Sequence, residues 1–181
     1  AEDLAKENGV GHLIKFVKGD FTNTNFPDNF FDVVWGLESI CYAKNKKDFL
    51  KEARRILKKN GRLIVADGFI KKENLEANEY REMQKWLGGW AVPNLASVNK
   101  FKKYLEQLNF KNIQFKDIKE NVMPSSVRMY GASILCYPIG KILELAGLRT
   151  KIQTGNIVSA FYQHKTLKKS LWTYGIFYAE K

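Results

Sequence analysis

Acidic residues come shortly after two apolar runs of this chain, at positions where a carboxylate could bind a ligand. Asp20 comes after the run Leu13–Val17, and Asp67 comes after Arg62–Ala66. Ligands of open α/β sheets bind at the carboxyl ends of the strands, so both residues are candidate site residues. The Asp20 carboxylate can accept a hydrogen bond from an exocyclic amine, or it can cap a turn. Asp67 could likewise be a site residue or a plain cap at the end of its strand.

A second candidate group lies in the segment from Gly36 to Tyr42, which follows another apolar run. Glu38 and Ser39 could orient a polar group of a substrate, or they could cap the helix that follows. Tyr42 is a poor base at neutral pH because its ordinary pKa is near 10. It is better suited to donating a hydrogen bond or to lining a pocket.

The two histidines and the two cysteines are far apart in sequence. His12 follows a helix-ending glycine and is predicted to be a surface or cap residue. His164 is a candidate catalytic residue on a predicted lid helix, although a lone helical histidine is more often packed or exposed. Cys41 and Cys136 match no metal-binding spacing, so we predict reduced thiols and no metal site.

An alternation of strand, helix and strand positions these side chains. We predict strands at Leu13–Val17 and Phe30–Trp35, the second buried on both faces of a parallel sheet because its apolar run is continuous. The apolar residues of Lys46–Lys59 fall on one helical face, and Gly61 is predicted as a left-handed cap. The strand Arg62–Ala66 follows, so the two later strands should be parallel and joined by a right-handed crossover.

The rest of the chain is predicted from the same patterns. One-sided apolar spacing indicates helices, and alternation indicates strands. The helices are expected at 73–90, at 97–108 with Ser97 as the N-cap, at 126–145 and at 156–168, and the strands at 110–118 and 171–180.

Taken together, the motifs of these segments resemble those of the class I, Rossmann-like S-adenosylmethionine-dependent methyltransferases. The resemblance rests on Gly19-Asp20, Phe26-Pro27-Asp28, Phe31-Asp32-Val33-Val34, and Asn60-Gly61 before Leu63-Ile64-Val65. The resemblance is specific over about residues 13–68. It implies an α/β fold with a helical lid insertion and an antiparallel last strand. It also implies methyl transfer as the activity and S-adenosylmethionine as the cofactor.

The resemblance further implies roles for single residues. Asp20 would bind the adenine amino group, and Phe21 would offer its backbone amide and an apolar edge. Gly36 and Leu37 would run beneath the reactive sulfonium. Many similar small-molecule methyltransferases have a histidine base where this sequence has Tyr42, so histidine-type base catalysis is not expected there. The candidate catalytic residues are Tyr42, Glu38 and His164.

The family's glycine-rich cofactor loop would lie upstream of Ala1, so we expect a single incomplete methyltransferase domain that lacks the first two strands. This chain alone could then be inactive. Residues 1–70 would form the C-terminal part of the cofactor-binding half. The lid and substrate segments would be 71–109 and 124–168, and the late strands 110–119 and 171–181. The open sheet edge would favour self-association.

Aromatic residues of the predicted lid indicate an apolar cavity, and Gly88 to Ser125 resembles tocopherol and sterol methyltransferases. We therefore expect a small, hydrophobic or lipid-like methyl acceptor. Two alternatives stay open: a catalytically incompetent binding or regulatory subunit, and an RNA-binding or RNA-methyltransferase fragment. The lid residues concerned are Trp86, Trp90, Met123, Met129, Tyr130, Phe161 and Tyr162.

The net charge of +11 is the one anomaly of composition. The lysines are spread along the chain without a nucleic-acid-binding motif, so we expect a solvated lysine surface and no specific nucleic-acid partner. No run reaches the roughly 18 apolar residues of a membrane span, while peripheral membrane contact stays open. The first residues lack a signal-peptide pattern, and the predicted location is cytoplasmic.

Overall fold

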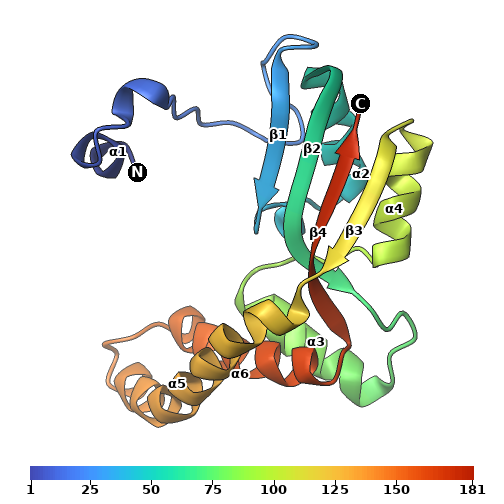
Figure 1. Ribbon diagram of the computed structural model, residues 1–181. Helices are drawn as coiled ribbons and strands as arrows, with labels where there is room; N and C mark the ends of the chain where they lie inside the picture. Colours follow the sequence, from blue (N-terminus) through green and yellow to red (C-terminus); the bar gives the residue numbers. More distant parts are fainter.

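A four-stranded mixed sheet organises the computed structural model, which describes all residues from 1 to 181. The strand order is β1-β2-β4-β3, with β1 parallel to β2 and β4 antiparallel to both of its neighbours (Figure 1). The predicted α/β class and the antiparallel last strand are therefore confirmed. The strands are β1 (Phe31–Leu37), β2 (Leu57–Ile70), β3 (Lys111–Asp117) and β4 (Trp172–Glu180).

Two amphipathic helices cover one face of this sheet. The helix α2 (Lys46–Ile56) connects β1 to β2, and α4 (Val98–Gln107) precedes β3. The Ser97 side chain accepts a hydrogen bond from the Lys100 amide, which confirms the predicted N-cap of α4. The helices and the sheet share one apolar core, formed by Phe49, Leu50, Ala53, Leu63, Val65, Phe101, Leu105 and Phe177 among others.

The connection between α2 and β2 differs from the prediction. The helix ends at Ile56, because the fully buried Leu57 already takes extended backbone angles and pairs with Phe31. Asn60, and not Gly61, takes the left-handed conformation, with φ of 62°. Gly61 is required for a different reason: a Cβ atom there would lie 2.8 Å from the Lys58 carbonyl oxygen.

The apolar run predicted a strand buried on both faces, and this prediction is wrong. The strand β1 is at the edge of the sheet, and one of its faces is exposed. The face of the sheet opposite α2 and α4 carries no helix in Figure 1, and β1 has a neighbour on one side only. Trp35 is consequently 65% exposed, and Val33 and Leu37 are exposed too. A continuous apolar run could not distinguish this open strand from a buried one.

A helical block lies beyond the end of the sheet at which β1 and β2 finish (Figure 1). It contains α3 (Ala77–Gly89), α5 (Lys119–Leu145) and α6 (Lys151–Lys168). The Trp86 ring on α3 stacks on Trp172 of β4 with ring centroids 4.1 Å apart, which fixes the block to the sheet. The helix α6 begins five residues earlier than predicted, because Thr150 and Gln153 form a capping box.

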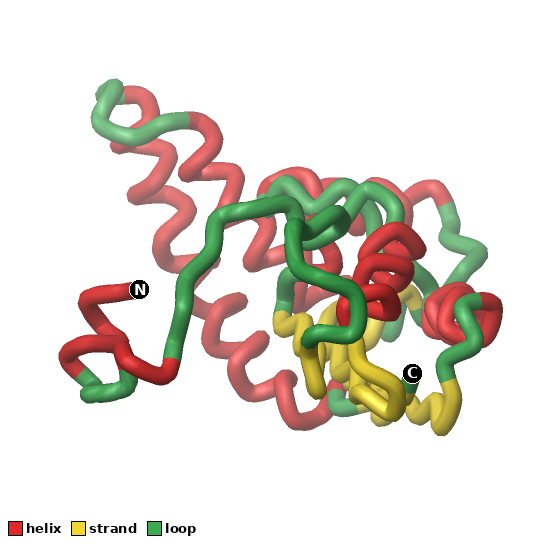
Figure 2. Tube along the Cα trace, turned by 90° about the horizontal axis from the view of Figure 1, so that it is seen from above, coloured by secondary structure: helices red, strands yellow, loops and turns green.

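The N-terminal arm runs away from the sheet and contains α1 (Glu2–Glu7) and the short 3-10 helix η1 (Gly11–Leu13), as Figures 1 and 2 show. The predicted strand at Leu13–Val17 is wrong for this structure. Ile14 has extended backbone angles, but no strand pairs with it, and a strand needs the hydrogen bonds of a neighbour. No helix of the fold has both the length and the apolar character required to cross a membrane.

Candidate active site at the carboxyl ends of the central strands

The carboxyl ends of β1 and β2 lie side by side, with Gly36 paired to Val65 and Leu37 to Ala66. We call this place the carboxyl edge, and it comprises residues 36–42 and 67–69. A Cβ atom at Gly36 would lie 2.7 Å from the Ile40 Cδ1 atom, so a larger residue there would have to displace the buried Ile40 side chain. The positive φ of Glu38, 46°, makes that turn.

Asp67 holds the carboxyl edge together from within. Its carboxylate is almost fully buried and accepts hydrogen bonds from the backbone amides of Cys41, at 2.9 Å, and Gly68, at 2.7 Å. Burial raises the pKa of Asp67, because the charged form loses its hydration. The sequence left open whether Asp67 is a site residue or a strand-end cap, and these contacts are those of a cap.

Lys46 is buried next to the carboxyl edge and contacts the partly buried Cys41, and sequence reasoning did not single out this lysine. The Lys46 ammonium donates hydrogen bonds to the carbonyls of Cys41, Ala43 and Asn94, at 2.8, 2.6 and 2.9 Å. Burial lowers the pKa of Lys46 to about 8, and burial with the Asp67 charge raises the pKa of Cys41 to about 12. No sequence signal marks Lys46, since a lysine in the first turn of a helix is ordinarily solvated.

Glu38 is joined to the last strand across the edge. The Tyr174 hydroxyl donates a hydrogen bond of 2.9 Å to Glu38 Oε1, and no side chain or backbone group binds the other carboxylate oxygen. Burial and the Glu38 carboxylate raise the pKa of Tyr174 above its ordinary value. Tyr42 is half exposed in the 3-10 turn η2 (Ile40–Tyr42), and burial raises the pKa of this hydroxyl as well. Neither tyrosine is suited to act as a base at neutral pH.

Asp20 and Phe21 lie in an irregular loop packed on α2. Asp20 Oδ1 accepts hydrogen bonds from the Thr22 amide, at 2.8 Å, and from the Thr22 hydroxyl, at 2.7 Å. These bonds lower the pKa of Asp20. The Oδ2 atom has no partner in the chain and is exposed with the rest of the residue. The Phe21 ring packs edge-on against Phe49, near the start of α2, which is the end of that helix closest to the carboxyl edge.

The buried carboxylate of Glu52 and the partly exposed Arg55 tie this loop to α2. Glu52 Oε1 accepts hydrogen bonds from the Thr24 amide and hydroxyl, at 2.9 and 2.6 Å, and Arg55 binds both Glu52 and Asp28. The Arg55 hydrogen bond and the Thr24 bonds lower the pKa of Glu52 to about 2. Glu52, a residue that the sequence did not mark, therefore helps to anchor the loop that carries Asp20.

His164 lies within the helical block, where α5 and α6 pack together. Its Nδ1 atom is 3.2 Å from the Ser126 hydroxyl, and its ring is 4.8 Å from the Tyr130 ring, between centroids. Burial, together with the charge of Lys168, lowers the pKa of His164. All of these contacts are internal to α5 and α6, and none of them joins His164 to the carboxyl edge.

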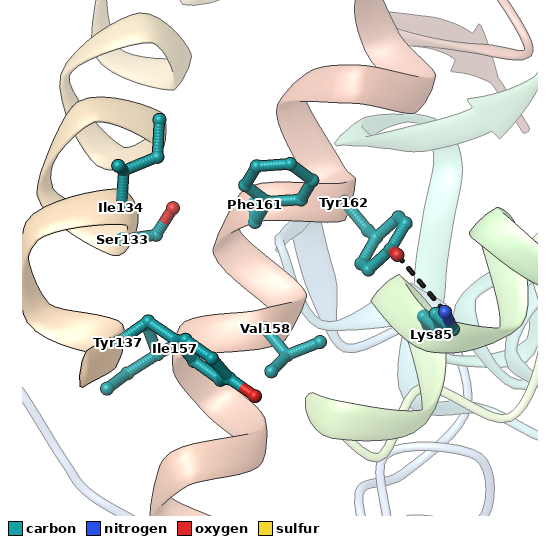
Figure 3. A pocket seen from close by; sticks show the side chains of 8 residues that line it. All are labelled: Lys85, Ser133, Ile134, Tyr137, Ile157, Val158, Phe161 and Tyr162. Carbon is teal, nitrogen blue, oxygen red and sulfur yellow. Dashed lines mark hydrogen bonds between the residues drawn. The ribbon is translucent and has the colours of Figure 1, made fainter. Parts of the chain in front are cut away.

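An apolar groove of about 470 Å³ opens between α5 and α6, with α3 along one side (Figure 3). Phe161 and Tyr162 line it, as the sequence suggested, and Lys85 donates a hydrogen bond to the Tyr162 hydroxyl. Trp86 lies elsewhere, stacked in the core beneath the block. The lining residues are Lys85, Ser133, Ile134, Tyr137, Ile157, Val158, Phe161 and Tyr162.

Residues 1–65 match the family model described as "Methyltransferase domain". The chain is 29% identical over 126 residues to "Probable tocopherol O-methyltransferase, chloroplastic" of Oryza sativa subsp. japonica, which covers 67% of the chain and 35% of the relative. It is 30% identical over 116 residues to the sarcosine/dimethylglycine N-methyltransferase of Halorhodospira halochloris, covering 63% and 39%. The chain thus spans little more than a third of the length of these curated relatives.

The fold is similar to a crystal structure of a candidate sarcosine dimethylglycine methyltransferase from Galdieria sulphuraria. The TM-score is 0.77 at 13% identity, over 99% of this chain and 64% of that one. These matches confirm the resemblance drawn from the sequence and favour neither the regulatory nor the RNA-binding alternative. Residues 1–65 thus match a methyltransferase-domain model, and the chain has the fold of the Rossmann-like, S-adenosylmethionine-dependent methyltransferases.

Proposed function

We propose that this chain takes part in the transfer of a methyl group from S-adenosylmethionine to a small, hydrophobic acceptor. The observation that carries the proposal is the carboxyl edge, where the Gly36–Leu37 backbone turns over the end of β1 within a methyltransferase-family segment. When bound, S-adenosylmethionine supplies an electrophilic methyl group on a sulfonium. The protein therefore has to bind the two reactants, orient them and exclude water.

The donor and acceptor atoms of the chain fit this cofactor. Asp20 Oδ2 is a free carboxylate oxygen that can accept a hydrogen bond from the adenine amino group, while Oδ1 stays in its turn. Phe21 offers an apolar ring edge beside it. Gly36 has no side chain and Ile40 packs over it, so it can offer only its backbone, while the neighbouring residue Leu37 is exposed. We assign cofactor contacts to these four residues.

Glu38 and Tyr42 are our candidates for orienting the acceptor. Tyr174 occupies one Glu38 oxygen, which leaves the other to accept a hydrogen bond or a proton from an acceptor hydroxyl or amine. Tyr42 is half exposed at the same turn and can donate a hydrogen bond or form a wall. The internal contacts of His164 support a packing role, and we give it no step in the reaction.

The helical block supports a hydrophobic acceptor. We propose that residues 71–109 and 124–168 serve as lid and substrate segments, within a single domain of residues 1–181. The groove between α5 and α6 is lined mainly by aliphatic and aromatic side chains, which suits an apolar molecule better than a small zwitterion. Relatives named for tocopherol and sterol methylation agree with this class, whereas those named for sarcosine favour a polar amine.

Titration calorimetry with S-adenosylmethionine and with S-adenosylhomocysteine tests the binding step. The Asp20→Asn variant keeps an oxygen for the Thr22 turn but loses the second accepting oxygen, so we expect binding about ten-fold weaker. Asp3→Asn, an exposed residue of α1, is the matched control and should bind normally. Unchanged binding by Asp20→Asn would leave Asp20 as a turn cap only, and no binding by the folded wild-type protein would overturn the proposal.

A radiolabelled methyl-transfer assay tests the acceptor class. We expect label to enter a phenolic prenyl-chain acceptor or a sterol in preference to sarcosine. Transfer to sarcosine alone would refute the hydrophobic class while leaving methyl transfer intact.

A further inference from the structure

The hairpin of α5 and α6 projects from the body of the molecule, and its loop lies at the far end (Figures 1 and 2). We call residues 135–152 the hairpin tip. Its large apolar side chains point away from any core that the fold contains, and several are among the most exposed of the whole chain. They are Leu135, Ile139, Ile142, Leu145, Leu148 and Ile152, whereas Tyr137 lines the groove between α5 and α6.

These exposed apolar side chains are clustered in one short segment, unlike the isolated leucines found on most protein surfaces. Leu145, Leu148 and Ile152 are 84%, 77% and 79% exposed, and they lie at the end of α5, in the loop and near the start of α6. Contiguous exposed apolar surface on a water-facing protein marks a site of contact with a protein, a ligand or a membrane. Because the tip is at the end of a projecting hairpin, it can be covered without a clash from the sheet.

The charges of the hairpin tip indicate which kind of partner covers it. It carries the basic residues Lys141, Arg149 and Lys151 and one acidic residue, Glu144, which is paired with Lys141 at 2.7 Å. The chain as a whole has a net charge of +11. A second copy would bring the same positive charge and be repelled, whereas an anionic surface would be attracted. Leucines and isoleucines between basic residues are the composition of segments that lie in a bilayer interface.

We propose that the hairpin tip docks onto anionic lipid bilayers, with its apolar side chains in the interface and Lys141, Arg149 and Lys151 beside the headgroups. This surface is separate from the carboxyl edge and does not depend on the proposed methyl transfer. The contact is peripheral, since its apolar residues come from two helix ends and a short loop.

Vesicle co-sedimentation tests the proposal, with the purified protein and vesicles of phosphatidylcholine containing about a third phosphatidylserine. We expect the wild-type protein to sediment with these vesicles, to bind pure phosphatidylcholine at least ten-fold more weakly, and to be released by high salt. The variant Leu145→Ser/Leu148→Ser/Ile152→Ser should lose at least ten-fold in partitioning. These side chains contribute little to the core, so circular dichroism should stay unchanged.

The matched control is Leu4→Ser/Leu13→Ser, which removes exposed leucines of the N-terminal arm and should bind vesicles as the wild type does. Lys151→Gln should weaken binding to anionic vesicles without affecting the weak binding to neutral ones. Equal binding by the triple variant and the wild type would overturn the proposal. So would a wild-type dimer that the triple variant converts to a monomer, without vesicle binding by either.

Discussion

The Tyr174 hydroxyl donates a 2.9 Å hydrogen bond to the Glu38 carboxylate, and so connects the last strand of the chain to the turn after its first strand. The two residues are 136 positions apart in sequence. Through this bond the antiparallel strand β4, placed between β2 and β3, takes part in shaping the carboxyl edge. The insertion of β4 therefore does more than complete the sheet.

Tyr174→Phe removes this hydrogen bond while keeping the ring. If Glu38 orients the acceptor, its carboxylate should become mobile and the acceptor KM should rise about five-fold, because one hydrogen bond is worth about 1 kcal/mol. The affinity for S-adenosylmethionine should not change. Steady-state kinetics and calorimetry measure the two quantities. Tyr178→Phe, on the same strand with its hydroxyl on Glu180, is the control and should leave the KM unaltered.

Asp67→Ala deprives the buried amides of Cys41 and Gly68 of their acceptor. We expect the free energy of unfolding to fall by about 3 kcal/mol, since unsatisfied buried donors carry their full desolvation cost. Urea unfolding followed by circular dichroism gives this value. Asp67→Asn keeps one accepting oxygen and should cost less. Equal losses for the two variants would mean that packing, and not the hydrogen bonds, explains the role of Asp67.

Glu52 should make the protein sensitive to acid. Its pKa is about 2 in the folded chain, against an ordinary value of 4.5, so it stabilises the fold fully above about pH 4.5. That contribution is lost as the pH falls from 4.5 towards 2, because the unfolded chain takes up the proton first. Thermal unfolding measured across this range should show a steeper loss of stability for the wild type than for Glu52→Gln.

The control for Glu52 is Glu106→Gln, which removes an exposed carboxylate in a loose pair with Lys102. Its acid limb should match that of the wild type. Hydrogen exchange should also show faster exchange in residues 20–28 of Glu52→Gln, because the bonds to Thr24 anchor that loop. A Glu52→Gln protein with unchanged acid stability would contradict the anchoring role.

Two adjacent glycines at the end of α3 should respond in opposite directions to alanine. At Gly89 a Cβ atom would overlap Ser159 Oγ and would lie 2.7 Å from the Gly155 carbonyl oxygen, where α3 meets α6. Gly89→Ala should therefore destabilise the protein by about 2 kcal/mol. At Gly88 no atom lies within 4 Å, so Gly88→Ala should stabilise the helix by about 0.5–1 kcal/mol. Chemical unfolding of both variants provides the comparison.

Local patterns in the sequence were enough to place most elements. The apolar spacing of α2 and α4, the Ser97 cap and the alternation of β3 all appear where they were predicted, because these signals act between residues a few positions apart. The exact helix ends were less predictable. Leu57 is in β2 and not in α2 because its burial and its pairing with Phe31 outweigh its helical spacing.

The sequence by itself determined the resemblance to the methyltransferases, the class of fold and the order of the elements from residue 30 onward, since these depend on local periodicity and on short motifs. Only the tertiary structure decided which side chains meet. It paired Tyr174 with Glu38, buried Lys46 among three carbonyl groups, enclosed His164 between two helices and left Leu13–Val17 without a strand partner. Such contacts join residues that are distant along the chain, and their energies depend on burial and neighbours that no local pattern contains.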